Sequence, residues 1–252
     1  MEVRAILLAG GLGSRLLPLT KHTQKCMLAV HDRPILDYCL STVRQAGIKK
    51  ITIVANQFIE QISHHVGTGL GDEHIEYVLE KEPRGVLEAL ILAQPHHLDC
   101  RHLVYFVDNI TTIDLNPTVE AFESQNKNPG CVMLGREVDN PKDFGVAQFK
   151  DGILVDVIEK PQYPPSRTAI GGIYLYDETF WDKVQQSLDK HRMNASISDV
   201  NRMYIQEDNA DLISIGPDTW FDCGTHESLL RVSELARQGR LKPVLFSREV
   251  SN

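Results

Sequence analysis

The sequence lacks the features of a disulfide-rich, zinc-binding or membrane-spanning protein. Its five cysteines are an odd number, and no two have the C-x-x-C spacing of a zinc site or redox pair. No apolar run reaches the length of about 18 residues that spans a bilayer. Arg4 interrupts the N-terminal apolar segment, so we expect no signal peptide. Free thiols fit a reducing compartment, and we therefore expect a cytoplasmic protein with no membrane partner.

Basic residues are too few for a nucleic-acid-binding surface. The 252-residue chain has a formal net charge of −8, whereas a nucleic-acid binder needs a basic face. A single positive pocket can still exist inside an acidic protein. The sequence also has no internal repeat and no Gly-, Ser- or Pro-rich linker. We therefore expect one domain over residues 1–235, followed by a tail at 236–252.

Apolar periodicity predicts strands and helices that alternate in the first half of the chain. Short apolar runs separated by helical patterns imply βαβ units and a mostly parallel sheet. Right-handed crossovers would then place helices on both faces of the sheet. The expected strands are 3–9, 50–55, 75–79 and 102–107, and the expected helices are 35–46, 57–66 and 86–94.

The second half of the chain has more strands than helices. Lys150-Asp151-Gly152 is a hairpin turn between two of the strands. Thr225 is a suitable N-cap for the last helix. The expected strands are 132–137, 146–149, 153–158, 172–176 and 210–215, and the expected helices are 177–188, 199–206 and 225–238.

The most informative stretch follows the first expected strand. Residues 10–16 are Gly-Gly-Leu-Gly-Ser-Arg-Leu, and Lys25 comes ten residues after Arg15. Glycines let backbone N–H groups converge on an anion. A P-loop is excluded because no Lys-Ser or Lys-Thr pair follows the glycines, and Leu16 replaces the third glycine of a dinucleotide fingerprint. The loop indicates a nucleoside triphosphate site, with a ligand-free tight turn as the alternative.

Two aspartates follow apolar runs. Asp108 ends the run at 103–107, and Asp222 lies in a short apolar strand that begins at Trp220 and ends in a glycine turn before a helix. Ligands of open α/β sheets bind beyond the carboxyl ends of strands, where a carboxylate can hold Mg²⁺. The alternative for Asp108 is a turn or helix cap, because Asp-Asn is typical of turns.

Together these motifs resemble the sugar-phosphate nucleotidyltransferases, most closely the short form of the glucose-1-phosphate thymidylyltransferases. The likeness reaches about Leu235 and implies an α/β fold with a Rossmann-like, mixed but mostly parallel central sheet flanked by helices, of the nucleotidyltransferase or glycosyltransferase-A-like kind. It also implies a nucleotide half at about 1–130 and a sugar-phosphate half at about 131–235. The motifs are the glycine loop with Pro18 and Thr20, Asp108-Asn109, Phe144-Gly145-Val146, Glu159-Lys160-Pro161, Ile170-Gly171-Gly172-Ile173-Tyr174, Ser198-Asp199-Val200-Asn201 and Trp220-Phe221-Asp222-Cys223-Gly224-Thr225.

The resemblance implies a reaction in which a sugar 1-phosphate attacks the α-phosphorus of an NTP and pyrophosphate leaves. Asp108 and Asp222 would coordinate Mg²⁺ together, and Arg15 and Lys25 would bind the triphosphate. Lys160 would bind the acceptor phosphate, although an exposed ion pair before a proline is its simpler interpretation. The implied nucleotide-binding residues are Leu8, Ala9, Gly10, Gly11, Gly13, Ser14, Arg15, Lys25, Glu80 and Gly85. The implied sugar-phosphate-binding residues are Gly145, Glu159 and Lys160, with Ile170 and Gly172 in a turn that contacts the sugar.

Two positions depart from the family pattern. Glu80 replaces a glutamine that reads the pyrimidine, and an ionised glutamate can only accept hydrogen bonds. It suits guanine or cytosine, or it points to solvent while the backbone reads the base. Val107 replaces a glycine beside the expected metal site, so the acceptor need not be glucose 1-phosphate and need not be a sugar.

We expect dTTP or UTP with a hexose 1-phosphate as substrates, and a homo-oligomer, which is usual in the family. A guanylyl- or cytidylyltransferase is the first alternative, and a non-catalytic nucleotide-binding relative is the second. An NAD-dependent oxidoreductase is excluded by Leu16 and by Asn56 and Gln57, because an acidic residue would be needed after the second strand.

Overall fold

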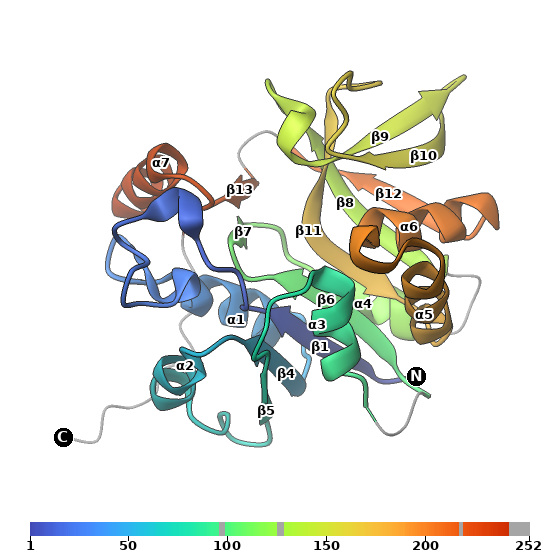
Figure 1. Cartoon of the computed structure of the whole chain (residues 1–252). Coiled ribbons are helices and arrows are strands. Elements are labelled where there is room, and N and C mark those ends of the chain that lie inside the picture. The colour runs from blue at the N-terminus through green and yellow to red at the C-terminus, as the bar shows by residue number, and fades with distance from the viewer. Residues whose placement is uncertain (96–98, 125–128, 217–218, 242–252) are drawn as a thin grey trace.

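One nine-stranded mixed sheet runs through both halves of the chain (Figure 1). The computed structural model describes residues 1–95, 99–124, 129–216 and 219–241. Most of the expected tail, from 242 onward, lies outside the described residues, and its first residues belong to the last helix. No helix in the described part of the chain is long and apolar enough to cross a membrane.

The first half of the chain forms the expected parallel βαβ units. In register, Leu7 pairs with Ile53 on one side and with Tyr105 on the other, so these strands end at one edge of the sheet. The strands are β1 (Val3–Leu8), β4 (Lys50–Ala55), β5 (His74–Leu79) and β6 (Arg101–Phe106), in the order β6-β1-β4-β5, and the helices are α1 (Ile35–Gln45), α2 (Ile59–Val66) and α3 (Val86–Leu92).

The second half extends this sheet mainly with antiparallel strands. The strand that joins the halves is β11 (Thr168–Tyr176), which pairs antiparallel with β6. On its other side it pairs with two further antiparallel neighbours. The remaining strands are β8 (Cys131–Glu137), β9 (Gly145–Lys150), β10 (Ile153–Glu159) and β12 (Ala210–Ser214), and the helices are α5 (Phe180–His191), α6 (Ile197–Gln206) and α7 (His226–Arg237).

Alternation along the strands divides the interior into two cores. In β1, Ala5 and Leu7 belong to a core shared with α1 and α7, whereas Ile6 belongs to a core shared with α3, α5 and α6. Successive strand side chains point to opposite faces, so the sheet is covered on both sides (Figure 1). This arrangement confirms the expected α/β fold with helices on both faces.

Several short elements were not predicted from the sequence. One is β7 (Asn109–Thr111), which forms a two-stranded ribbon with β13 (Trp220–Asp222), the short strand that was expected before the glycine turn. The others are α4 (Asn116–Glu123), the two-residue strands β2 (Ala29–Val30) and β3 (Arg33–Pro34), and four single 3₁₀ turns at Ser14–Leu16, Lys25–Met27, Pro141–Asp143 and Arg192–Asn194.

The turn expected around Ile170 and Gly172 is wrong, because both residues lie inside β11. The family resemblance implied a turn, whereas the structure shows a strand in which the two glycines leave space for neighbouring side chains. A Cβ atom on Gly171 would lie 3.2 Å from the Trp220 ring. A Cβ atom on Gly172 would lie 2.7 Å from the Asn109 side chain. The strand is locally irregular here, since its register with β8 shifts between Ile170 and Tyr174.

Candidate active site

The glycine loop at 10–13 is fixed through its carbonyl oxygens. Three buried side chains donate to the carbonyl oxygens of this loop and of Ala9 before it; Thr20 belongs to the quoted loop motif, whereas Gln24 and Asn56 were not expected to hold the loop. The bonds run from Gln24 Nε2 to the Ala9 carbonyl, from Asn56 Nδ2 to the Gly10 carbonyl (3.1 Å) and from Thr20 Oγ1 to the Gly13 carbonyl (2.8 Å). The loop amides form no hydrogen bond with any described residue. They therefore remain available to an anion, as a phosphate cradle requires.

The backbone conformation explains why the third glycine of the motif, Gly13, has to be glycine. Gly13 has φ of +62°, and a Cβ atom there would lie 2.7 Å from Thr20 Cγ2. Only glycine adopts this backbone without strain. The chain then makes a single 3₁₀ turn, which anchors on the fully buried Leu16.

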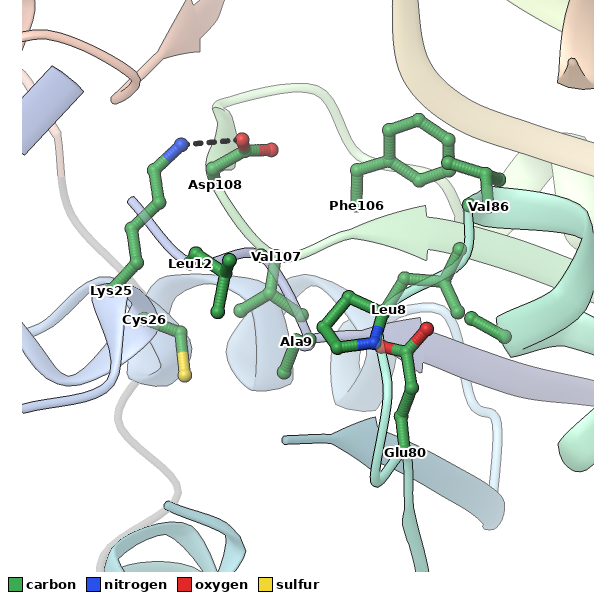
Figure 2. Close-up of a pocket in the computed structure, with 15 residues that line it drawn as sticks. Leu8, Ala9, Leu12, Lys25, Cys26, Glu80, Val86, Phe106, Val107 and Asp108 are labelled. Carbon is green, nitrogen blue, oxygen red and sulfur yellow. Dashed lines mark hydrogen bonds and ion pairs between the residues drawn. The ribbon is translucent and has the colours of Figure 1, made fainter. Parts of the chain in front are cut away.

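A pocket at the carboxyl ends of β1 and β6 contains most of the expected nucleotide-binding residues (Figure 2). We call it the nucleotide pocket after this expectation. Gly13, Ser14 and Arg15 do not line it. Glu80 and the Lys25–Asp108 pair lie at opposite ends of this pocket (Figure 2). The expected residues that do line it are Leu8, Ala9, Gly10, Gly11, Lys25, Glu80 and Gly85.

Glu80 is an acid buried in the nucleotide pocket. Its side chain lies over Gly10, and the residue is only 4% exposed. Burial raises the pKa of its carboxyl group, and a hydrogen bond from the Arg84 backbone opposes this only in part. No cation pairs with it among the described residues. The alternative that Glu80 points to solvent is therefore wrong.

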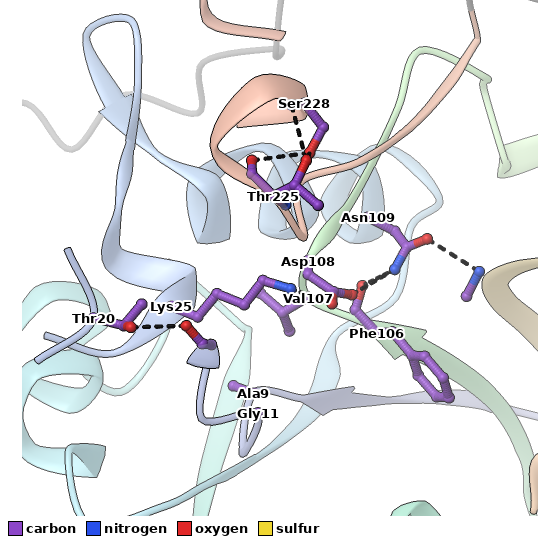
Figure 3. A network of polar contacts seen from close by, with 12 residues as sticks. Ala9, Gly11, Thr20, Lys25, Phe106, Val107, Asp108, Asn109, Thr225 and Ser228 are labelled. Carbon is purple, nitrogen blue, oxygen red and sulfur yellow. Dashed lines mark hydrogen bonds and ion pairs between the residues drawn. The ribbon is translucent and has the colours of Figure 1, made fainter. Parts of the chain in front are cut away.

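Asp108 and Asp222 come together although 114 positions separate them in the sequence. The β7–β13 ribbon pairs Asn109 with Asp222, and the Cys223 N–H donates to the Asp108 carbonyl at 2.7 Å. Lys25 Nζ lies 2.6 Å from Asp108 Oδ2 (Figure 3). Burial, followed by the charge of Asp108, raises the pKa of Asp222.

These carboxylates fit the requirements of Mg²⁺. The ion is usually held by one or two carboxylates together with substrate phosphate oxygens rather than by a full protein cage. Accordingly, the described residues contain no cluster of three or more His, Cys, Asp or Glu residues suited to a metal. The charge of Asp108 already disfavours ionised Asp222, so a cation between them would relieve repulsion. The positive charge of Lys25 already offsets part of the repulsion between the two carboxylates.

A second pocket contains the expected sugar-phosphate residues, namely Gly145, Glu159, Lys160, Ile170 and Gly172. We call it the acceptor pocket after this expectation. It is also lined by Arg15 and Asp222, so Arg15 approaches the site from the acceptor side. Most of its other lining residues come from β9, β10, β11, the start of α6 and β13, and Val86, Phe106 and Asn109 add α3, β6 and β7.

Glu159 and Lys160 are held differently within this acceptor pocket. Glu159 Oε2 accepts a hydrogen bond from Ser198 Oγ at 2.6 Å, which leaves Oε1 for another donor. Lys160 has φ of +42°, an uncommon value for a residue with a side chain. Its side chain is 65% exposed, with Nζ 3.8 Å from Glu159 Oε1. Strained backbone of this kind clusters at functional sites.

The two pockets share Val86, Phe106 and Asp108 as lining residues. Asp108 therefore lies where a ligand of one pocket would meet a ligand of the other. Ser198 and Trp220 were missed as individual site residues, although both belong to quoted motifs. Only their position beside Glu159 and Asn109 distinguishes them.

Comparison with known proteins gives the same family. The family model for nucleotidyl transferases matches residues 4–239. A glucose-1-phosphate thymidylyltransferase of Neisseria meningitidis is 32% identical over 90% of this chain and 80% of its own length. The low-salt glycan biosynthesis nucleotidyltransferase Agl11 of Haloferax volcanii is 30% identical over 94% of this chain and 67% of its own.

Solved structures agree with this relationship. A candidate glucose-1-phosphate thymidylyltransferase from Bacillus anthracis, in complex with sucrose, has a TM-score of 0.86 at 32% identity and covers 93% of this chain and 95% of its own. A UDP-glucose pyrophosphorylase with UDP-glucose has a TM-score of 0.80 at 19% identity, over 95% of this chain and all of its own, and so shares the fold. The chain therefore belongs to the nucleotidyl transferase family and is a sugar-phosphate nucleotidyltransferase.

Proposed function

We propose that this enzyme joins dTTP or UTP to a hexose 1-phosphate in the presence of Mg²⁺, giving an NDP-hexose and pyrophosphate. The observation that carries the proposal is the junction of the two pockets at Asp108. Lys25 and Asp222 both lie at this junction. The substrates named for the Neisseria meningitidis relative support a pyrimidine nucleotide and a hexose.

The proposed reaction is a single displacement that needs positioning and charge neutralisation. A phosphate oxygen of the sugar phosphate forms a bond to the α-phosphorus, and the bond to the pyrophosphate oxygen breaks with its electron pair. Lys160 would hold the attacking phosphate, and Lys25 with the loop amides would hold the triphosphate. Fixed donors aimed at developing charge are an effective means of lowering such a barrier.

Asp108 and Asp222 would hold Mg²⁺, which when bound supplies Lewis-acid stabilisation of charge on the phosphate oxygens. Arg15 would add positive charge from the acceptor side, where it lines the pocket with Asp222. Glu159 would accept a hydrogen bond from a sugar hydroxyl through Oε1, since Ser198 occupies Oε2.

A guanylyl or cytidylyl transfer is the second candidate, favoured by Glu80. A buried carboxylate without a cation gains most from a base that offers N–H donors. Guanine offers its N1–H and amino group, and cytosine offers its exocyclic amine. Thymine and uracil offer only the N3–H, and an ionised Glu80 cannot donate to their O4.

The test of the reaction is pyrophosphate release with Mg²⁺ over a grid of dTTP, UTP, GTP and CTP against hexose 1-phosphates and non-sugar phosphates. We expect release that needs both substrates and stops in EDTA, with dTTP or UTP and a hexose 1-phosphate as the best pair. Release that is fastest with GTP or CTP would establish the second candidate. No release with any pair would contradict the proposed reaction.

Glu80→Gln tests which base the pocket reads. Glutamine keeps the shape but can both donate and accept, so we expect kcat/KM for dTTP or UTP to rise relative to GTP by about tenfold or more, the scale of one hydrogen bond to a charged group. The matched control is Glu82→Gln, because Glu82 is exposed and pairs with Arg84. Equal base preference in wild type and Glu80→Gln would show that Glu80 does not read the base.

A further inference from the structure

Asn109 uses its whole hydrogen-bonding capacity inside the protein. It follows Asp108 directly and is only 5% exposed. Nδ2 donates to Asp108 Oδ1 at 2.6 Å and to the Phe106 carbonyl at 3.1 Å. Oδ1 accepts from Trp220 Nε1 at 2.6 Å and from the Gly172 N–H at 3.2 Å. An amide has two donors and one acceptor oxygen with two lone pairs, so Asn109 has no free group for a substrate.

These bonds fix the Asp108 carboxylate from one side, while Lys25 holds it from the other. Asn109 binds Oδ1 and Lys25 binds Oδ2, both at 2.6 Å (Figure 3). The orientation of the carboxylate is therefore set before any ligand arrives. Groups that orient a metal ligand in this way affect metal affinity although they do not touch the metal.

Asn109 is itself held by Trp220 and Gly172, two residues that line the acceptor pocket. Trp220 begins β13, the strand that ends at Asp222, and Gly172 lies in the acceptor strand β11. The double glycine provides space for both partners, because a Cβ atom on either residue would crowd the Trp220 ring or the Asn109 amide. One side chain thus connects Asp108 to Asp222's strand and to the wall of the acceptor pocket.

We propose that Asn109 is a positioning residue that holds the Asp108 carboxylate in a fixed relation to the acceptor pocket. The inference rests on the proposed function, since it assigns metal and phosphate binding to Asp108. Asn109 acts through Asp108, and Trp220 acts through Asn109. Loss of Asn109 should therefore weaken metal binding while leaving the base end of the nucleotide pocket intact.

The test is Mn²⁺ binding by the full chain, measured from free Mn²⁺ by electron paramagnetic resonance, without any turnover. For Asn109→Ala we expect Mn²⁺ affinity to fall by about tenfold or more, the usual effect of removing a group that orients a metal ligand. Binding of dTTP and GTP in EDTA should change less than about twofold. Unchanged Mn²⁺ affinity in this variant would overturn the proposal.

The matched control is Asn201→Ala, since Asn201 is also fully buried but bonds to Tyr176 and Cys131 away from Asp108. It should lose thermal stability and keep wild-type Mn²⁺ affinity. If Asn201→Ala and Asn109→Ala weaken Mn²⁺ equally at equal loss of stability, the role of Asn109 is only structural and the proposal fails.

A second variant keeps the test decisive if Asn109→Ala does not fold. Trp220→Phe keeps an aromatic ring at this position and removes the N–H donated to Asn109 together with part of the indole, so its thermal unfolding is measured beside its Mn²⁺ affinity. It should weaken Mn²⁺ binding less than Asn109→Ala, and the double variant should be no weaker than Asn109→Ala alone. Unchanged affinity in Trp220→Phe, or additive losses in the double variant, would overturn the connection through Asn109.

Different results would contradict the proposed function and the role of Asn109. A wild-type enzyme that releases no pyrophosphate with any substrate pair contradicts the proposed function. An active wild-type enzyme whose Asn109→Ala variant binds Mn²⁺ equally well contradicts the role of Asn109 alone.

Discussion

The nucleotide pocket and the acceptor pocket are built in different ways. The nucleotide pocket takes its phosphate end from one contiguous loop after β1, with carbonyl groups fixed by Gln24, Asn56 and Thr20. The acceptor pocket is assembled from separate segments that range from Arg15 to Asp222, and its charged groups are side chains. We therefore expect triphosphate binding to use backbone amides together with Lys25, and acceptor binding to depend mainly on side chains.

The largest expected effect comes from the residue that the two pockets share. Asp108→Asn keeps the shape of the side chain but weakens metal binding, and loss of metal assistance is worth several kcal/mol. Turnover should therefore fall by about a hundredfold or more. Pyrophosphate release measures this change, with thermal unfolding to show that the fold is retained. Asp114→Asn, an exposed aspartate in the loop before α4, is the control. Activity near wild type in Asp108→Asn would contradict the metal assignment.

A smaller effect, confined to the binding of the sugar phosphate, is expected at Lys160. Lys160→Ala removes the only lysine that lines the acceptor pocket among the described residues. The KM for the sugar phosphate should rise by about tenfold, the scale of a charge-assisted hydrogen bond. The KM for the nucleotide should not change. Steady-state kinetics with each substrate varied in turn gives both values, and Lys142→Ala serves as the exposed control. Equal rises in both KM values would show that the pockets are not separate in function.

The smallest expected effect is on stability at Asp222. Its pKa is raised by burial and by Asp108, so the folded state holds the proton more tightly than the unfolded chain. Stability then falls as pH rises from the ordinary aspartate pKa through the folded value, and remains lower above it. Asp222→Asn should lose activity yet be as stable as wild type, or more stable by up to about 1 kcal/mol, at neutral pH without metal.

Thermal unfolding between pH 4 and pH 8 in EDTA measures this difference. The gain of Asp222→Asn over wild type should be largest at the alkaline end and shrink as the pH falls. A variant that is clearly less stable than wild type at pH 8 would show that the Asp222 carboxylate stabilises the fold.

The sequence predicted the parts of the site that are local in the chain. The glycine loop, Lys25 and the strand before Asp108 carry their signal within a few residues, because backbone geometry and residue type together specify a phosphate cradle. The α/β class followed from periodicity, and the sheet confirms it. Arg15 was placed with the nucleotide, but it lines the acceptor pocket, since a single 3₁₀ turn follows the loop.

Contacts between distant segments could not be predicted in the same way. The short strand at Trp220–Asp222 was expected, but its pairing with β7 was not, because three residues in each strand are too few to indicate a partner. Gln24, Ser198 and the hydrogen bonds of Asn109 depend on which segments meet. The turn at Ile170 and Gly172 was implied by the family resemblance, and a sequence alone does not show that these glycines instead make room for Trp220 and Asn109.

We propose that the enzyme performs one direct displacement, with no covalent enzyme intermediate, where the two pockets meet at Asp108. The most direct measurement of this step follows an α-³²P-labelled NTP, with the base that the substrate grid selects, mixed with enzyme, Mg²⁺ and the sugar 1-phosphate. We expect the label to move into the NDP-sugar only when both substrates are present, the pyrophosphate to be unlabelled and the protein never to become labelled. Label attached to the protein, or label that fails to enter an NDP-sugar, would contradict the proposal.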